Sequence, residues 1–242
     1  MDETSPAVWD GARMFSQIAQ DLAGQHGYAC TGDRVLQLAT LLIECDTAAI
    51  WSMNSGHAKV HATTDPTVRL LEPVVNHEKD GLAWSCLHRK ATLRIDDVRT
   101  DGRWPVYQRW LERHDQPMLS AIGYSLEVDD QIIGALVLWS RQVAHFTDRR
   151  VDIGAIFADH AAVSLELAAV EDRAQHLENA LQSNRRIGMA IGILMSEYRV
   201  TDQTGFDMLR VVSQRQHRKL HDVAEDVILT GALADYPVRR PA

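Results

Sequence analysis

The chain has 242 residues, of which 45% are hydrophobic and 24% charged, and its formal net charge is −8. These values fit one or two soluble globular domains. No apolar run has the length of a transmembrane helix, and the first residues lack the basic and apolar segments of a signal peptide, so we expect a cytoplasmic protein without a membrane partner. The three cysteines, Cys30, Cys45 and Cys86, are widely spaced without a CxxC pattern, which predicts reduced, mostly buried thiols.

The first part of the chain mixes helical and strand patterns. Apolar residues recur at helical spacing over 8–25 and 33–44, and residues 46–64 predict two strands joined by a turn at Asn-Ser-Gly. Helical segments follow to about residue 77 and over 81–90, then a short strand near 93 and a helix over 104–114. Two clear strands, 118–128 and 131–140, are linked by an acidic turn. This order predicts an α+β domain with an antiparallel sheet.

Two stretches at the end of this region carry a family resemblance. The strand pair ending in IIGALVLWS and the following AHFTDRRVDIGAIFADHAAVSLELA resemble a GAF domain, over roughly residues 8–165. The resemblance implies a module that senses a small molecule or another signal and that often dimerises. The NKFDE-like signature of cyclic-nucleotide-binding members is absent, which argues against such a ligand.

No catalytic pattern occurs in the sequence. A P-loop, a GxGxxG after a strand, GxSxG and HExxH are all missing, so we predict a protein that is not an enzyme and needs no cofactor. His57 and His61 fall on one side of a strand but lack further metal ligands at recognisable spacing, so no metal site is predicted. Trp104, Tyr107 and Trp110 either pack in the core or wall a ligand pocket.

A long helix connects the two ends of the protein. Residues 155–187 contain neither glycine nor proline, and apolar residues recur at alternating steps of three and four for about four heptads. This pattern predicts a coiled coil over 153–184 and a parallel homodimer. The alternative is that the helix packs only on its own domain. The predicted seam contains Ile153, Ile156, His160, Val163, Leu167, Val170, Ala174, Leu177, Leu181 and Asn184.

Three short helical patterns follow between residues 180 and 231. The segments RRIGMAIGILM, TGFDMLRVVS and RKLHDVAEDVILTG resemble the ANTAR module, a helical RNA-binding domain of bacterial transcription antiterminators, over 180–232. The resemblance implies binding to paired RNA stem-loops. Ile191 stands where many members carry lysine, and His217 where they often carry asparagine. The tail over 233–242 is expected to be disordered.

The C-terminal segment is locally basic. Between residues 184 and 219, seven Lys and Arg residues accompany three Asp and Glu residues, a local charge of +4. Such a surface attracts RNA phosphates, although an ordinary solvated helix face is the alternative. We predict phosphate or base contacts from Arg185, Arg186, Arg210, Arg218 and Lys219, loop contacts from Ser213, Gln214 and His217, and close approach at Met189, Ala190 and Gly192, where core packing is an equal explanation.

Together these patterns predict a dimeric, non-enzymatic regulator of transcription antitermination that binds structured RNA and is gated by its GAF domain. Two alternatives remain open at this point. The protein could be a DNA-binding regulator that places a helix in the major groove. It could also be a ligand- or protein-binding sensor whose helical tail docks a protein partner.

Overall fold

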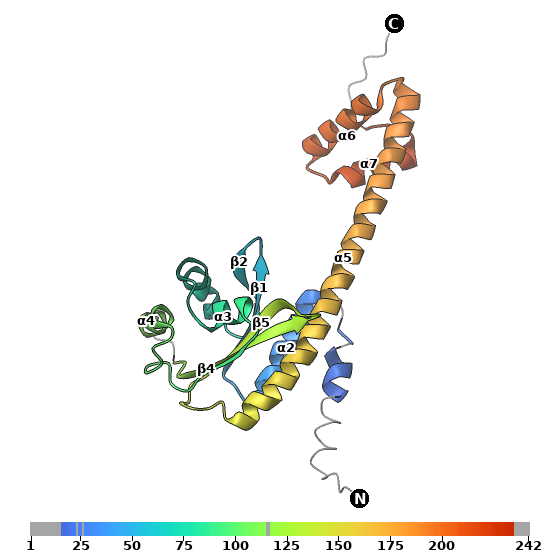
Figure 1. The fold of residues 1–242 in the computed structure, drawn as a ribbon. Helices are drawn as coiled ribbons and strands as arrows, with labels where there is room; N and C mark the ends of the chain where they lie inside the picture. Colours follow the sequence, from blue (N-terminus) through green and yellow to red (C-terminus); the bar gives the residue numbers. More distant parts are fainter. Residues whose placement is uncertain (1–15, 23, 26, 115–116, 235–242) are drawn as a thin grey trace, which may run out of the picture. The chain divides into compact units, whose positions relative to one another are not determined.

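The computed structural model describes residues 16–22, 24–25, 27–114 and 117–234 (Figure 1). The chain forms two compact units, Met1–Asp172 and Arg173–Ala242, which are described separately below. The first unit combines a sheet with helices and the second is helical, so the predicted fold class is confirmed. The predicted helix over 8–25 is described only in part: residues 16–22 are helical, and its earlier residues lie outside the described range.

The first unit is built on a five-stranded antiparallel sheet with the strand order β2-β1-β5-β4-β3. The strands are β1 (Thr47–Asn54), β2 (His57–Thr63), β3 (Thr92–Ile95), β4 (Ser120–Val128) and β5 (Gln131–Ser140). Ser55 and Gly56 have φ angles of 50° and 80°, the left-handed pair that a two-residue hairpin favours. Asp129 and Asp130 do the same between β4 and β5, with φ angles of 47° and 63°. Both predicted turns are therefore confirmed.

Helix α2 (Tyr28–Ile43) and the first part of helix α5 (Asp148–Tyr198) cover one face of the sheet (Figure 1). Helix α5 contributes Phe157, Ala161 and Leu165 to this core. The helical spacing over 33–44 predicts an apolar face of Val35, Leu38, Leu41 and Leu42, which is partly wrong, because Leu41 is 73% exposed. At about 100° per residue, Leu41 lies about 200° around the helix from the buried Ala39 and so faces solvent.

The other face of the sheet is covered by four short helical segments: η1 (Pro66–Leu71), η2 (Val74–Glu78), α3 (Leu82–His88) and α4 (Pro105–Arg113). Trp139 on β5 donates a hydrogen bond from Nε1 to the Tyr107 hydroxyl at 2.5 Å, which joins α4 to the sheet. The Asp80 carboxylate accepts from the backbone N–H groups of Val106 at 2.8 Å and Tyr107 at 3.4 Å. Because the first turn of a helix has unpaired N–H groups, this contact fixes the start of α4.

A glycine sets how closely α5 approaches the sheet. A Cβ atom placed on Gly154 would lie 2.1 Å from the Tyr124 hydroxyl oxygen and 2.6 Å from Cζ of the same ring. Tyr124 is buried on β4, and its hydroxyl donates to the Val151 carbonyl of α5 at 3.2 Å. The missing side chain at Gly154 therefore leaves the space that the tyrosine occupies.

The second unit packs helices α6 (Asp202–Gln216) and α7 (Leu220–Thr230) on the C-terminal end of α5. Its core contains Ala190, Leu194, Met208, Leu209, Val212, Val223, Ala224, Val227 and Leu233. The Thr201 hydroxyl accepts from the Thr204 N–H and caps α6, and Gly231 ends α7 with a φ angle of 74°. The predicted tail begins too early, because Leu233 is buried in this core; residues 235–242 lie outside the described range.

Candidate functional site

Between residues 184 and 219 the second unit exposes seven basic residues: Arg185, Arg186, Arg199, Arg210, Arg215, Arg218 and Lys219. Three of the predicted contact residues form ion pairs, Arg186 with Glu225 at 2.5 Å, Arg210 with Asp207 at 3.0 Å and Arg218 with Asp226 at 2.5 Å. Exposed pairs of this kind contribute only about 0–1 kcal/mol to stability, so these guanidinium groups can exchange a carboxylate for a phosphate. Among the described residues, Arg185 and Lys219 have no carboxylate within ion-pair distance.

The end of α6 gives Ser213 and His217 a structural role. The Arg218 N–H donates to the Ser213 carbonyl at 3.1 Å, and the His217 N–H donates to the Gln214 carbonyl at 3.4 Å. His217 has a φ angle of 53°, so these bonds form the left-handed closure that commonly ends a helix. Asparagine and histidine tolerate this conformation better than most residues, which explains why either type suits the position.

The same turn engages the Ser213 side chain. Its hydroxyl donates to the Arg218 carbonyl at 2.6 Å, so Ser213 holds the connection between α6 and α7 in place. The neighbouring Gln214 is exposed, and the His217 side chain is exposed as well. Of the three predicted loop contacts, Gln214 and His217 thus present side chains to solvent, whereas the Ser213 hydroxyl is engaged in an intramolecular hydrogen bond.

The small residues near the end of α5 fall into two groups. Ala190 is fully buried in the core, so the structure assigns its side chain to packing and corrects its predicted place at the interface. Met189 is 49% exposed, and a Cβ placed on Gly192 would meet no atom within 4 Å. Only Met189 and Gly192 of this group therefore lie at the surface.

Ile191 packs α5 against α6. Its Cγ2 atom lies 3.3 Å from a Cβ placed on Gly205, a buried glycine in α6. The isoleucine therefore supports a close contact between helices in the position where many related sequences carry lysine. Sequence reasoning did not single out Gly205, although a glycine inside an amphipathic helix often marks close packing.

Helix α5 also carries a stripe of exposed apolar side chains. Between 45% and 62% of the surface of each is accessible, and they are Ile156, Val163, Leu167, Val170, Leu177 and Leu181. The buried face of the same helix consists of other residues, including Phe157, Ala161 and Leu165. Ile153 and His160 are half-buried, and Ala174 and Asn184 are exposed. The first part of α5 therefore packs on its own domain and still presents the heptad stripe.

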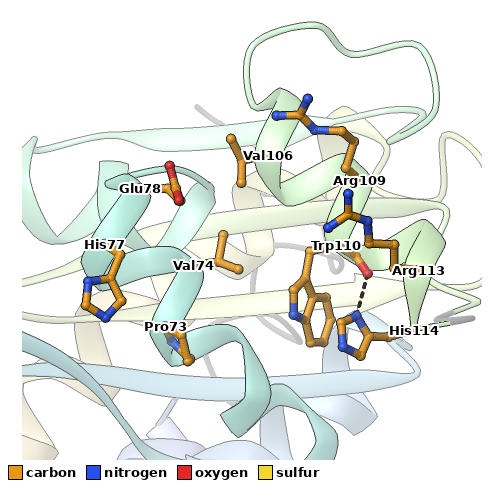
Figure 2. Close-up of a pocket in the computed structure, with 9 residues that line it drawn as sticks. All are labelled: Pro73, Val74, His77, Glu78, Val106, Arg109, Trp110, Arg113 and His114. Carbon is orange, nitrogen blue, oxygen red and sulfur yellow. Dashed lines mark hydrogen bonds between the residues drawn. The ribbon is translucent and has the colours of Figure 1, made fainter.

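The three aromatic residues proposed as a pocket wall do not meet in one pocket. Tyr107 is buried in the core, where burial raises the pKa of its hydroxyl. Trp104 lines a cleft with Trp84 and Arg103, and Trp110 lines a separate groove between η2 and α4 (Figure 2). The prediction of a single pocket is corrected, because Tyr107 is buried and bonded to Trp139, whereas Trp104 and Trp110 line two different cavities.

Comparisons with known proteins assign both units. The profile of the GAF domain matches residues 30–165, more than half of the chain, and the profile of the ANTAR domain matches residues 175–228. The chain belongs to the GAF-ANTAR regulators. A GAF domain is a sensor module and an ANTAR domain an RNA-binding module of antitermination regulators, so the general function of this GAF-ANTAR protein is transcription regulation through RNA. Neither domain is a catalytic one.

Solved structures support the fold of the GAF unit. A GAF domain from a phosphoenolpyruvate-protein phosphotransferase of Coxiella burnetii aligns with a TM-score of 0.54 and 15% identity, over 70% of this chain and 99% of that chain. A free methionine-R-sulfoxide reductase from Neisseria meningitidis aligns with a TM-score of 0.53 and 12% identity, over 70% and 96% of the two chains. At these identities the likeness shows the fold alone. No curated protein matches the chain.

The described residues of the GAF-ANTAR protein contain no group of three or more His, Cys, Asp or Glu side chains that could hold a metal ion. Helix α5 is the one described helix that is long and apolar enough to span a membrane by composition, with an 18-residue window of mean hydropathy 1.5. Both units bury apolar residues of this helix, and 39% of that window is buried.

The three free cysteines differ in exposure, which gives a testable difference in reactivity. Cys45 and Cys86 are buried, and burial raises the pKa of both thiols to about 12, whereas Cys30 is exposed. Because the thiolate is the reactive form, we expect a thiol reagent at neutral pH to label Cys30 alone in the native GAF-ANTAR protein, and all three after unfolding. Intact-mass spectrometry counts the labels. The Cys30→Ser variant is the control, and rapid labelling of that folded variant would contradict the expectation.

Proposed function

We propose that this GAF-ANTAR protein is a homodimer that binds paired stem-loops in nascent transcripts, and that its GAF domain gates the binding. The ANTAR match supports RNA as the partner, and the exposed apolar stripe on α5 is the observation that carries the dimer. The same helix belongs to both units, since it begins at Asp148 in the GAF unit and ends at Tyr198 in the ANTAR unit.

The stripe is the kind of surface that a coiled coil buries. Together with His160 and Ala174, its six residues repeat at alternating steps of four and three, the spacing that keeps side chains on one seam of paired helices. Burying a Leu or Val side chain stabilises an assembly by roughly 1.5–3 kcal/mol, so six residues from each of two copies supply ample energy even after association costs. In a parallel pair the two ANTAR units would be tethered together.

Tethering explains how modest contacts could select paired RNA loops. Each ANTAR unit exposes basic side chains for phosphates, and the exposed Gln214 and His217 offer donors and acceptors to unstacked loop bases. When one unit has bound a first loop, the second binds its loop at high effective concentration. Two adjacent hairpins are therefore favoured over one.

Gating would act through α5. A ligand-dependent change in the GAF domain would reach the ANTAR unit by altering the register, splay or pairing of this shared helix. The ligand must then bind one arrangement of the helix more tightly than the other, because it can shift an equilibrium only between states that it binds differently. The effect on RNA would then follow from a change in how the two ANTAR units are held.

The RNA contacts give a direct test. We expect Arg185→Gln combined with Lys219→Gln to weaken binding to a two-hairpin RNA, because these residues have no carboxylate partner among the described side chains. Each lost phosphate contact should also reduce the slope of log affinity against log salt by roughly 0.7–0.9. Filter binding over a range of salt concentrations measures both quantities.

A matched control removes two charges elsewhere. Arg141→Gln with Arg149→Gln changes exposed residues of the GAF domain and should leave RNA affinity unchanged. Duplex DNA that competes as well as the two-hairpin RNA would support a DNA-binding regulator instead. A wild-type protein that ignores both nucleic acids at low salt would favour a tail that docks a protein partner.

A further inference from the structure

A groove of about 590 Å³ lies between η2 and α4 of the GAF domain (Figure 2). One wall is a single face of α4, since Val106, Arg109, Trp110 and Arg113 recur at helical spacing. The opposite face of this helix is anchored in the core by Tyr107 and Leu111. Side chains of η2, including Val74 and Glu78, form the facing wall.

The groove is held in shape by the protein itself. Asp80 follows η2 by two residues, and its carboxylate accepts from the Val106 N–H on α4 at 2.8 Å, so one contact joins the two walls. The hydrogen bond from Trp139 to Tyr107 fixes α4 to the sheet beneath. A preorganised groove loses little conformational entropy when a ligand enters, which favours binding.

Two arginines in the groove have no charge partner within the part of the chain that the structure describes. Arg109 and Arg113 stand one helical turn apart, where like charges repel, and among the described residues neither has a carboxylate within ion-pair distance. Five other arginines of this domain pair with Asp or Glu, namely Arg34, Arg94, Arg99, Arg103 and Arg150, whereas Arg69, Arg89, Arg141 and Arg149 also have no carboxylate within ion-pair distance among the described residues. Figure 2 shows both guanidinium groups on the α4 side of the groove. Such a pair suits a carboxylate or phosphate.

A flat, partly apolar surface lies beside these charges. The rings of Trp110 and His114 stack with centroids 4.2 Å apart and planes inclined by 20°. Val74 of η2 lies on the facing wall and adds apolar surface (Figure 2). Glu78 on the facing wall would repel a second anionic group, so the groove favours one anionic group, placed at the α4 wall.

We propose that the groove between η2 and α4 binds a small aromatic anion, with its ring against Trp110 and its carboxylate or phosphate held by Arg109 and Arg113. The inference rests on the sensor role in the proposed function and names the ligand class for it. Its test measures binding to the groove without RNA, so the failure of one proposal leaves the other standing.

The experiment uses the full-length protein labelled with fluorotryptophan, and the Trp110 fluorine resonance is assigned with Trp110→Phe. Phenyl phosphate and benzoate serve as probes. We expect at least one to shift the Trp110 resonance in a saturable way, and Arg109→Gln with Arg113→Gln to weaken that binding by at least about tenfold. The stronger of the two probes identifies the preferred acidic group.

The controls distinguish the contribution of the acidic group to binding from that of the aromatic ring. Arg141→Gln with Arg149→Gln should leave binding unchanged, and the remaining tryptophan resonances show whether each variant is folded. The proposal is overturned if neither aromatic anion gives a saturable shift, or if the arginine variant binds as tightly as wild type. It is equally overturned if neutral benzyl alcohol or inorganic phosphate alone binds as well as the aromatic anions.

Discussion

A protein carrying Leu177→Lys and Leu181→Lys is expected to be monomeric and to lose most of its affinity for a two-hairpin RNA. Both leucines are 62% exposed in the single chain and lie in the heptad stripe of α5. Lysine and leucine have similar helix propensities, so the substitutions leave α5 helical while placing four like charges in the seam of a dimer.

The expected size of the effect follows from burial and tethering. Four leucines per dimer would each lose roughly 1.5–3 kcal/mol of burial, which weakens dimerisation by at least about 1,000-fold. A monomer forfeits the avidity of two linked ANTAR units, a factor of about 100 or more in RNA affinity. Analytical ultracentrifugation measures the first change, and filter binding measures the second.

The matched control adds the same two charges on the outer side of the helix. Gln175→Lys with Asn179→Lys replaces exposed residues outside the seam and should preserve both the dimer and RNA binding. If the seam variant stays dimeric, the stripe is not the interface. If it is monomeric but binds the paired hairpins at wild-type affinity, tethering plays no part in recognition.

The Gly154→Ala substitution is expected to destabilise the GAF domain by at least about 2 kcal/mol. Alanine normally stabilises a helix relative to glycine by about 1 kcal/mol, but here the new methyl group would lie 2.1 Å from the hydroxyl oxygen of Tyr124. Either the buried ring or α5 must move, and the hydrogen bond from Tyr124 to Val151 is lost in the process.

Tryptophan fluorescence during denaturant unfolding measures this change. All six tryptophans precede residue 173, so their emission reports on the GAF unit alone. Gly102→Ala is the control, because a Cβ there meets no atom within 4 Å, and it should change stability by less than about 0.5 kcal/mol. Tyr124→Leu should cost less in the Gly154→Ala background than alone, and simple additivity of the two changes would contradict the proposed clash.

Much of the fold follows from local sequence signals. The Asn-Ser-Gly turn forces the β1–β2 hairpin, and the run without glycine or proline together with the heptad spacing predicts the long helix, because these signals act between neighbouring residues. The exposure of Leu41 was not predictable in this way, since helical spacing alone does not show which of several apolar residues meets the core.

The errors at the candidate sites have the same origin. Tyr107 turns inward because it bonds to Trp139, a residue 32 positions later in the chain, and no local pattern reveals that contact. Ala190 is buried while Met189 is exposed, because α6 and α7 select which side of α5 they cover. The hydroxyl of Ser213 is engaged by a turn whose geometry depends on the left-handed His217.

The carboxylates beside the ANTAR arginines affect discrimination among polyanions. Glu225, Asp226 and Asp207 act as built-in counterions, and an incoming phosphate must displace them before it gains its own contact. A single phosphate gains little binding free energy from that exchange. A rigid RNA backbone that presents several phosphates at once gains that free energy at each contact. Flexible polyanions with widely spaced charges are therefore expected to bind more weakly than a folded RNA. The net charge of the protein, −8, weakens their binding further through long-range repulsion.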